Sequence, residues 1–270
     1  MTRTLNGREL ADFIKQRQVR QVRNLRQEHR VIPKLVIIKS SNSSDVINTY
    51  VRLKQVYASD ITVEFGVVSC KQDEMRAAIA LANSDASVHG IVVQLPLDQP
   101  DETEGIVGTI APEKDVDGLG ASAAFHSATA EAIDWLLAGY NVDLEGKQIA
   151  IIGRGRLVGA PLDKMWRQRG YRVTCYDKGS DIGDVTSADV IVTATGSPRV
   201  LTPSMVKQKA VIIDAGTASE AGVIVGDVHP ELRQRSDITI TPEKGGVGPL
   251  TVAVMFDHVI QSALKVAGKL

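Results

Sequence analysis

The fold is indicated most directly by the stretch Gln148-Ile149-Ala150-Ile151-Ile152-Gly153-Arg154-Gly155-Arg156-Leu157-Val158-Gly159. It opens with a mainly apolar run, as in a strand buried on both faces of a sheet, and residues 160–169 follow a helical pattern. A strand that enters a helix through glycines forms the phosphate cradle of dinucleotide-binding folds, because backbone N–H groups then reach an anion at the positive end of the helix dipole. The stretch therefore predicts a dinucleotide site. Its glycine spacing, G-x-G-x-x-x-G, is one residue longer than that of the commonest NAD-binding motif. A tight strand-to-helix turn that binds no ligand is therefore the alternative.

Side chains near this turn leave the choice of dinucleotide open. Asp177 follows the next predicted strand, where the adenosine ribose is usually contacted. Its carboxylate would favour NAD, because it accepts from a free 2′-hydroxyl and repels a 2′-phosphate. Arg154, Arg156 and Lys178 would instead favour NADP. A further strand ends at Thr195-Gly196, where glycine allows close approach of a ligand. The predicted cofactor-binding residues are Gly153, Arg154, Gly155, Arg156, Val158, Gly159, Asp177, Thr195 and Gly196.

The whole chain alternates short apolar runs with helical stretches, which is typical of an α/β fold with parallel strands. The predicted strands are residues 35–38, 61–68, 91–97, 148–152, 172–176, 190–193, 211–214 and 238–240. A Gly, Ala and Ser-rich segment at 118–129 indicates a hinge. We therefore predict two α/β domains: residues 1–120 plus 250–270, and a Rossmann-like dinucleotide-binding domain of residues 121–249. The C-terminal helix should return to the first domain.

Composition excludes several classes of protein. The 270 residues carry 31 Lys and Arg against 32 Asp and Glu, so there is no basic excess to neutralise the phosphates of a nucleic acid. Cys70 and Cys175 offer neither a disulfide framework nor a metal-ligand cluster. The N-terminus has no apolar signal core, and we find no apolar run near the ~20 residues of a membrane span. These features predict a cytoplasmic protein with no metal and no membrane partner.

The first half of the chain carries a second group of chemically notable residues. Tyr50 and Lys54 share one face of a predicted helix, although a solvated pair is the alternative. Gln94 interrupts an apolar strand, and a buried amide must be hydrogen-bonded, so it is either structural or faces a ligand. Lys114-Asp115-Val116-Asp117-Gly118 places two carboxylates near the hinge, where an Asp-Gly turn is the alternative.

Taken in order, these motifs resemble the bifunctional methylenetetrahydrofolate dehydrogenase/methenyltetrahydrofolate cyclohydrolase family. The match covers residues 34–260. Its motifs are Tyr50-x-x-x-Lys54, Gly90-Ile91-Val92-Val93-Gln94-Leu95-Pro96-Leu97, Pro112-x-Lys114-Asp115-Val116-Asp117-Gly118, Gly153-Arg154 to Val158-Gly159-x-Pro161, Gly226-Asp227-Val228, and Thr241-Pro242-x-x-Gly245-Gly246-Val247-Gly248-Pro249-x-Thr251. Collinear motifs of this number are far more specific than any one of them.

The resemblance implies an activity. Methylenetetrahydrofolate would be oxidised to methenyltetrahydrofolate with NADP, or alternatively NAD, and then hydrolysed to formyltetrahydrofolate in one-carbon metabolism and purine biosynthesis. It also implies a homodimer joined through the cofactor domain. A monofunctional dehydrogenase or cyclohydrolase, and a non-catalytic ligand-binding member of the fold, are the alternatives.

The resemblance also implies roles for single residues of the first domain, which would bind the folate. Lys54 would handle protons in the hydrolysis, Gln94 would position and tune it, Tyr50 would pack near the pterin, and Asp117 would anchor the pterin ring. We expect the Lys54 and Gln94 side chains to converge on one cleft that faces the nicotinamide pocket. The implied substrate-binding residues are Tyr50, Gln94, Leu95, Pro96, Asp117, Gly245, Gly246 and Pro249.

The sequence departs from the family pattern beside the ligand sites. The segment 119–129 is shorter and lacks the usual Pro-Cys-Thr-Pro, Gly155 stands where Ser is common, and Glu243-Lys244 replaces Val-Pro. These departures would alter affinity, cofactor choice or one of the two activities.

Overall fold

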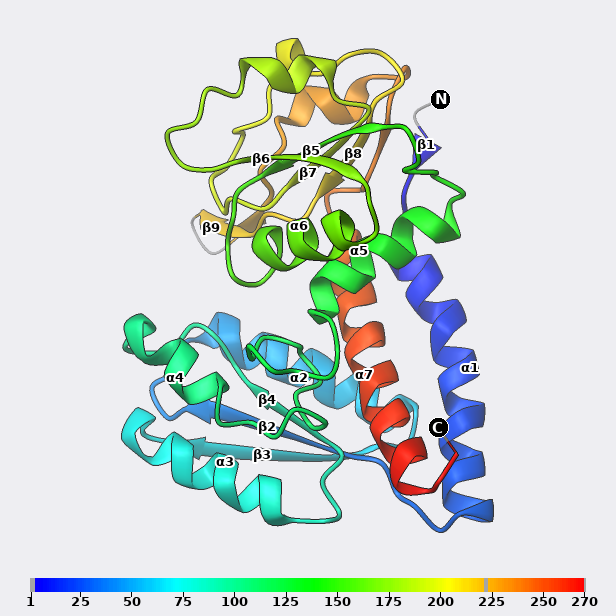
Figure 1. Ribbon diagram of the computed structural model, residues 1–270, viewed down its shortest axis with the longest axis vertical. Coiled ribbons are helices and arrows are strands. Elements are labelled where there is room, and N and C mark those ends of the chain that lie inside the picture. The colour runs from blue at the N-terminus through cyan, green and yellow to red at the C-terminus, as the bar shows by residue number, and fades with distance from the viewer. Residues whose placement is uncertain (1–2, 221–222, 270) are drawn as a thin grey trace. The chain divides into compact units, whose positions relative to one another are not determined.

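A computed structural model describes residues 3–220 and 223–269 of the chain. They form two compact units (Figure 1): unit 1 comprises Met1–Ala11 and Thr129–Thr251, and unit 2 comprises Asp12–Ala128 and Val252–Leu270. Both are α/β with parallel sheets, which confirms the predicted fold class. The prediction placed residues 1–120 in one domain, whereas the first eleven residues belong to unit 1. The reason is that β1 (Arg3–Thr4) pairs with a strand of unit 1.

Unit 1 is built on a six-stranded sheet of the order β1-β11-β8-β7-β5-β6, with parallel pairing throughout. Its strands after β1 are β5 (Gln148–Ile152), β6 (Arg172–Tyr176), β7 (Val190–Thr193), β8 (Val211–Asp214) and β11 (Thr239–Ile240). The neighbours of β5 in the sheet are β6 on one side and β7 on the other, so the direction of chain progression reverses there. Ligands of open α/β sheets bind outside the carboxyl ends of the strands at such a point.

Two helices pack together in unit 1, α5 (Ala128–Gly139) and α6 (Gly159–Gln168). The fully buried Trp166 of α6 donates its indole N–H to Asp134 of α5 at 3.1 Å. The remaining elements are the 3₁₀ turns Gly183–Ser187, Pro203–Met205 and Pro230–Gln234, and the hairpin of β9 (Ala218–Glu220) and β10 (Val223–Val225). The side chains that α6 buries fix this helix, and therefore the glycine turn before it.

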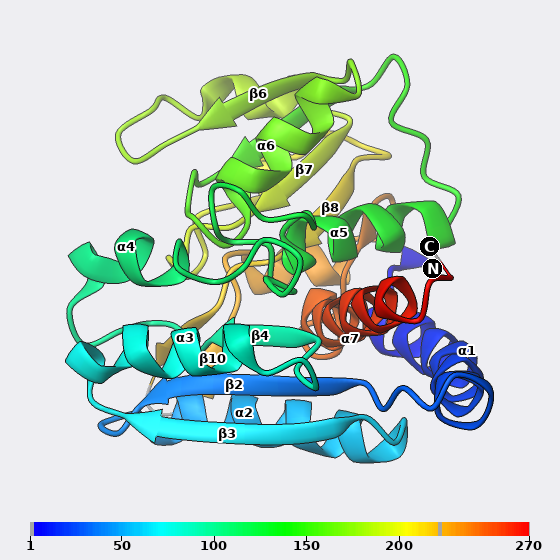
Figure 2. The same ribbon diagram turned by 60° about the horizontal axis from the view of Figure 1, so that its bottom comes forward.

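Unit 2 is built on a three-stranded parallel sheet of the order β3-β2-β4. Its elements are β2 (Lys34–Ser40), α2 (Asp45–Asp60), β3 (Glu64–Cys70), the 3₁₀ turn Gln72–Glu74, α3 (Met75–Ser84), β4 (Gly90–Val93), the 3₁₀ turn Pro100–Glu102 and α4 (Thr103–Val107). Helices α2 and α3 cover opposite faces of the sheet (Figures 1 and 2). Strand β4 is shorter than predicted, and the last sheet donor is the N–H of Gln94, bonded to Ile38 at 2.8 Å.

Unit 2 is completed by residues 12–28 of the long helix α1 (Gly7–Glu28) and residues 252–266 of α7 (Val247–Val266), while the first residues of both helices belong to unit 1. From α7, His258 Nδ1 lies 2.8 Å from the carbonyl of Val116, and the Ser262 hydroxyl donates to Glu113. Gly90 of β4 is so close to α7 that a Cβ there would lie 2.8 Å from Val259. The predicted return of the C-terminal helix to the first domain is therefore confirmed.

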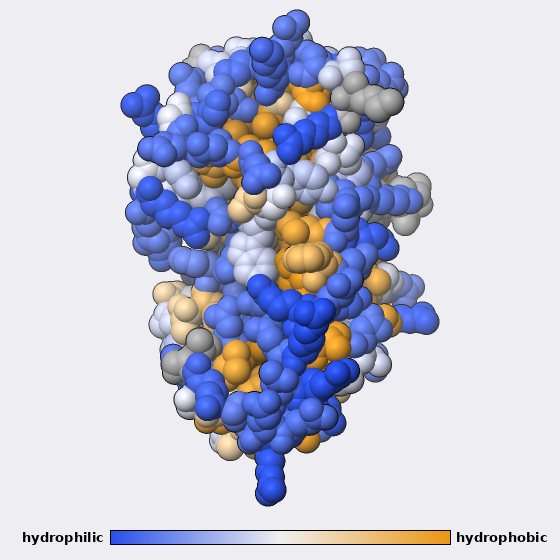
Figure 3. Space-filling model, turned by 90° about the vertical axis from the view of Figure 1, so that its right-hand side faces the viewer, coloured by the Kyte–Doolittle hydropathy of each residue, from blue (hydrophilic) through white to orange (hydrophobic). Residues whose placement is uncertain are grey.

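By length and composition alone, α7 is apolar enough to cross a membrane, which the sequence analysis did not detect. However, 67% of its most apolar window is buried inside the protein, as in the core helix of a globular domain. The face drawn in Figure 3 is mainly hydrophilic, with its apolar side chains in separate patches. The apolar character of α7 is thus explained by packing.

Candidate functional site

The structure brings Lys54 and Gln94 into direct contact in unit 2. Lys54 lies on α2, one turn after Tyr50, and its Nζ donates to Gln94 Oε1 at 2.6 Å. The Gln94 amide is oriented by its other end, because its Nε2 donates to the carbonyl of Leu95 at 3.1 Å. The amide oxygen is therefore held toward the lysine. Leu95 and Pro96, joined by a cis peptide bond, continue the chain beside this pair.

Burial shifts the protonation equilibrium of Lys54 toward the neutral amine. Burial lowers the pKa of Lys54 from its ordinary 10.5, and the Asp117 carboxylate acts in the opposite direction. Burial also raises the pKa of Asp117, against the effect of Lys54. Burial raises the pKa of Tyr50 as well. Each of these side chains, and that of Gln94, keeps part of its surface exposed, as a substrate-facing site requires.

The loop that carries Asp117 is fixed by Asp115, whose role the sequence analysis did not distinguish. Asp115 is only 1% exposed, and its carboxylate accepts from the N–H of Gly118 at 3.0 Å and of Gly120 at 2.7 Å. Gly118 has φ +67° and a Cβ there would lie 2.1 Å from the carbonyl of His126. Of the two predicted carboxylates, Asp117 is thus the one that faces the site and Asp115 is the one that holds the loop.

We expect Asp115→Ala to weaken binding of the substrate through this loop. Loss of the carboxylate leaves buried N–H groups without an acceptor, which costs about 1–3 kcal/mol of unfolding free energy. If Asp117 contacts the substrate as predicted, its displacement should raise the substrate KM several-fold with a smaller change in kcat. Steady-state kinetics and thermal unfolding measure the two effects. Asp115→Asn should restore much of the KM, because its amide oxygen still accepts, and Glu113→Ala at the exposed neighbour should change neither quantity. Equal losses in Asp115→Ala and Glu113→Ala would contradict this role.

The glycine turn of unit 1 is closed by its own backbone. Gly153 has φ +100° and a Cβ there would lie 2.5 Å from the carbonyl of Ala194, at the end of β7. A Cβ on Gly159 would lie 1.8 Å from the carbonyl of Gly153, so the start of α6 packs directly on the turn. Gly155 is under no such constraint, since a Cβ there would lie 3.8 Å from the carbonyl oxygen of Ala194, an ordinary van der Waals contact. The helix begins after Val158, which makes no side-chain cap. The N–H of Ala160 donates to the carbonyl of Gly155 at 3.1 Å and Pro161 has no N–H, so among the first three helical residues it is the N–H of Gly159 that can face an anion. This cradle fits a phosphate group.

The ends of the neighbouring strands are also placed by hydrogen bonds. Asp177 is exposed, and its carboxylate accepts from the N–H of Lys178 at 2.7 Å. Thr195 donates its N–H to the buried Asp227 carboxylate at 2.6 Å, and Gly196 follows with φ +66°. Burial raises the pKa of Asp227. In the sequence, Asp227 stands out only as part of the motif Gly226-Asp227-Val228, whereas in the structure it anchors the loop after β7.

The second glycine loop packs on the start of α1 within unit 1. Gly245 has φ +85° and its carbonyl accepts from the N–H of Arg8 at 2.9 Å. A Cβ on Gly7 would lie 1.9 Å from the carbonyl of Gly246. Pro249 lies in the first turn of α7. The predicted substrate-binding residues divide between the two units. Unit 2 contains Tyr50, Gln94, Leu95, Pro96 and Asp117, together with Lys54. Unit 1 contains Gly245, Gly246 and Pro249, together with the predicted cofactor-binding residues.

Together, unit 1 has the sheet order and glycine cradle of a nicotinamide-dinucleotide-binding domain, and unit 2 presents a desolvated lysine held by an amide beside a carboxylate. These features define a two-domain α/β dehydrogenase with additional proton-transfer chemistry. The chain belongs to the tetrahydrofolate dehydrogenase/cyclohydrolase family. The family's catalytic domain matches residues 5–117 and its NAD(P)-binding domain matches residues 127–267. The resemblance found in the sequence, and the bifunctional enzyme class that it implied, are therefore confirmed.

Relatives match over nearly the whole chain. The bifunctional protein FolD of Exiguobacterium sibiricum is 33% identical over 278 residues, which cover 97% of this chain and 100% of the relative. The crystal structure of the bifunctional FolD dehydrogenase/cyclohydrolase of Campylobacter jejuni superposes with a TM-score of 0.91 at 31% identity, covering 98% of this chain and 100% of that one. The FolD of Trypanosoma brucei, solved with NADP and an inhibitor, has a TM-score of 0.90 at 27% identity, covering 100% and 99%.

Proposed function

We propose that this protein oxidises methylenetetrahydrofolate to methenyltetrahydrofolate with NADP and hydrolyses the product to formyltetrahydrofolate. The observation that carries this proposal is the 2.6 Å contact between Lys54 Nζ and Gln94 Oε1 in a desolvated site with Asp117. Family membership supports both activities. In this assignment unit 2 binds the folate, and unit 1 binds the dinucleotide.

The residues of the glycine turn fit the dinucleotide. Gly153 and Gly159 form the cradle, and the start of α6 favours its phosphates electrostatically. Arg154 and Arg156 supply positive charge, which supports NADP, as does the NADP complex of the Trypanosoma relative. The chemistry that the bound cofactor supplies is acceptance of a hydride from the methylene carbon of the folate. The protein has to align the two rings for this step, and the step needs neither an acid nor a base.

Lys54 acts in the hydrolysis. Water adds to the cationic methenyl carbon and must lose a proton, which a neutral amine can accept. One of the two bonds from that carbon to nitrogen then breaks, and the departing nitrogen takes up a proton, which leaves the formyl group on the other nitrogen. Burial lowers the pKa of Lys54 and so increases the share of neutral amine, and a cationic substrate beside it acts in the same direction. Gln94 fixes the direction of the amine, because one N–H donates to Oε1 and the lone pair then points elsewhere. Lys54 is thus the general base, and Gln94 is its positioning residue.

The remaining first-domain residues bind the folate. Asp117 accepts from N–H donors of the pterin ring, a pairing that is strong because the acceptor is charged. Tyr50 packs against the pterin with its hydroxyl available for a hydrogen bond, while Leu95 and Pro96 supply apolar contact. Gly245, Gly246 and Pro249 complete the proposed set of substrate-binding residues.

A direct assay tests the proposal. Purified protein is mixed with methylenetetrahydrofolate and NADP or NAD, and the absorbance of the reduced nicotinamide and of the methenyl product is followed. We expect reduction of NADP together with decay of the methenyl product. Reduction without decay would indicate a monofunctional dehydrogenase, and decay of added methenyltetrahydrofolate without reduction would indicate a cyclohydrolase. Binding of both ligands without either reaction would support a non-catalytic member of the fold.

The hydrolysis should depend on pH through Lys54. Only the neutral amine accepts a proton, so the rate should rise with pH, with a midpoint below the ordinary lysine value of 10.5. Gln94→Glu adds a carboxylate next to Nζ, which stabilises the ammonium and shifts this rise to higher pH. The rate of methenyl decay, corrected for the uncatalysed reaction, is measured between about pH 6 and 10. An unshifted profile in Gln94→Glu would argue against Lys54 as the base.

We also propose a cytoplasmic homodimer joined through the cofactor domain, with a role in one-carbon metabolism and purine biosynthesis and no nucleic-acid or membrane partner. The balanced charge of the chain supports the absence of a nucleic-acid partner. Light scattering after size exclusion tests the oligomer: a dimer has twice the 29.0 kDa of the chain.

A further inference from the structure

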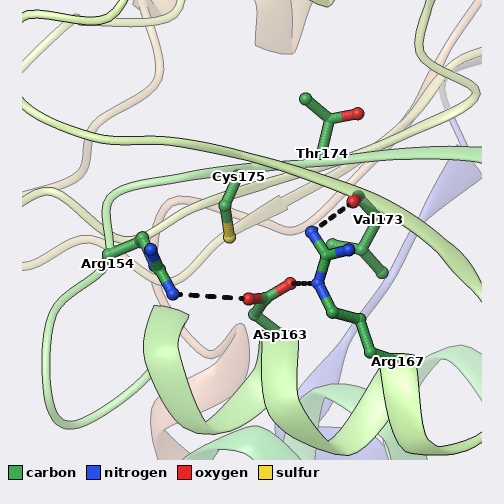
Figure 4. A pocket seen from close by; sticks show the side chains of 6 residues that line it. All are labelled: Arg154, Asp163, Arg167, Val173, Thr174 and Cys175. Atoms are coloured by element: carbon green, nitrogen blue, oxygen red, sulfur yellow. Dashed lines mark hydrogen bonds and ion pairs between the residues drawn. The ribbon is translucent and has the colours of Figure 1, made fainter.

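A cavity of about 510 Å³ lies beside the glycine turn, between α6 and the edge strand β6 (Figure 4). It is lined by Arg154, Asp163, Arg167, Val173, Thr174 and Cys175. Its charged side chains point toward one another: the two arginines lie on either side of the aspartate. Burial and Asp163 raise the pKa of the Cys175 thiol to about 11, so the thiol is neutral and the cavity carries one excess positive charge.

Asp163 is the centre of this group: its carboxylate is hydrogen-bonded to the Cys175 thiol and is held unequally by the two arginines. It is only 7% exposed. Arg167 Nε donates to Oδ1 at 2.5 Å, and Arg167 Nη2 also donates to the carbonyl of Val173 at 2.6 Å, so this arginine is tied to both α6 and β6. Arg154 Nη2 lies 3.8 Å from Oδ2, which is an ion pair at long range, and the Arg154 side chain is 53% exposed. Arg154 can therefore leave Asp163 while Arg167 still compensates the buried charge.

Arg154 also lies where a second anion would compete for it. It follows Gly153, whose N–H donates to the carbonyl of Tyr176 at 2.8 Å, so the turn is attached to the end of β6. In dinucleotide-binding folds, the 2′ position of the adenosine ribose is recognised at the end of this second strand, here at Asp177. A guanidinium suits a phosphate there, because it can donate two parallel hydrogen bonds.

We infer that Asp163 is a specificity-determining residue that competes with the 2′-phosphate of NADP for Arg154 and so narrows the preference for NADP over NAD. The inference rests on the proposed function, in which the dinucleotide binds at the glycine turn. Binding of a 2′-phosphate requires Arg154 to exchange one anion for another, whereas binding of a 2′-hydroxyl does not. Only the phosphorylated ligand is therefore penalised by Asp163.

The test uses two fragments that differ only in the 2′-phosphate, 2′,5′-ADP and 5′-AMP, titrated calorimetrically into the full-length protein. Asp163→Asn removes the charge but retains an oxygen that accepts from Arg167. We expect it to tighten 2′,5′-ADP about fivefold, as for a partly exposed ion pair, and to leave 5′-AMP within twofold. Thr174→Ala, in the same cavity and without a charge, should change neither.

A second variant separates competition from a general change in the cavity. Arg154→Gln should weaken 2′,5′-ADP, and Asp163→Asn added to it should have no further effect, because the contested side chain is absent. Weaker 2′,5′-ADP binding in Asp163→Asn would overturn the inference, since Asp163 would then orient Arg154 for the phosphate. An unchanged affinity, or an equal gain in 5′-AMP, would also overturn it. If the wild-type protein binds neither fragment, the proposed cofactor site fails as well.

Discussion

Lys54→Ala is expected to slow methenyl hydrolysis by about 10²–10⁴-fold, the usual contribution of a general base, while binding of the cofactor is retained. The lysine is the acceptor of the proton in the proposed reaction. Its hydrogen-bond partner, Gln94 Oε1 at 2.6 Å, cannot replace it because an amide oxygen is a far weaker base. The proposed cofactor-binding residues belong to unit 1, whereas Lys54 belongs to unit 2. The two readouts are the decay of methenyltetrahydrofolate and a calorimetric titration with NADP.

The neighbouring Gln55→Ala provides a matched control. Gln55 is exposed on the same helix, so its truncation should leave both readouts unchanged. The dehydrogenase step should suffer less than hydrolysis in Lys54→Ala, because hydride transfer needs alignment and no base. The ratio of the two activities should therefore change. Hydrolysis at the wild-type rate in Lys54→Ala would remove this residue from the mechanism.

The strands of unit 1 could be predicted from the sequence because each is a short apolar run with a clear end. Residues 148–152, 172–176, 190–193 and 211–214 coincide with β5 to β8. Helix α1 could not be recognised in the same way, since its buried stripe is interrupted by Gln18, which is fully buried. Gln18 accepts from the Tyr57 hydroxyl at 2.7 Å and donates to the carbonyl of Ala253 at 2.8 Å. Both partners are distant in sequence, so the spacing of apolar residues along α1 does not indicate that Gln18 is a core residue.

The site shows the same division between local and long-range information. Tyr50 and Lys54 could be placed on one helix face from their spacing, but the contact between Lys54 and Gln94 depends on how α2 and β4 lie in unit 2. The pattern could not separate Asp115 from Asp117, because both are carboxylates in one turn and only hydrogen bonding distinguishes them. Asp163 did carry a signal: it stands on α6 next to the buried Leu162, where a carboxylate needs a partner.

Replacing Gly159 by Ala should strongly weaken binding of the dinucleotide while leaving hydrolysis much less affected. The added Cβ would lie 1.8 Å from the carbonyl of Gly153, and the contact is with backbone, so the start of α6 must move away from the turn. Gly153→Ala should act similarly, because its Cβ meets the carbonyl of Ala194 and its φ of +100° disfavours any side chain. We expect at least a tenfold loss in NADP affinity and about 1–3 kcal/mol less unfolding free energy.

Gly155→Ala is the matched control, since its Cβ has no atom closer than 3.8 Å. It should keep NADP affinity within about threefold and unfolding free energy within about 0.5 kcal/mol. Calorimetric titration and thermal unfolding compare the three variants, and residual methenyl hydrolysis shows that unit 2 is folded in each. Gly159→Ala should thus lower the dehydrogenase activity more than the hydrolysis, because its steric effect is confined to the glycine turn. Lys54→Ala should lower the hydrolysis more than the dehydrogenase activity. Unaltered NADP binding in Gly159→Ala would mean that the dinucleotide is held elsewhere.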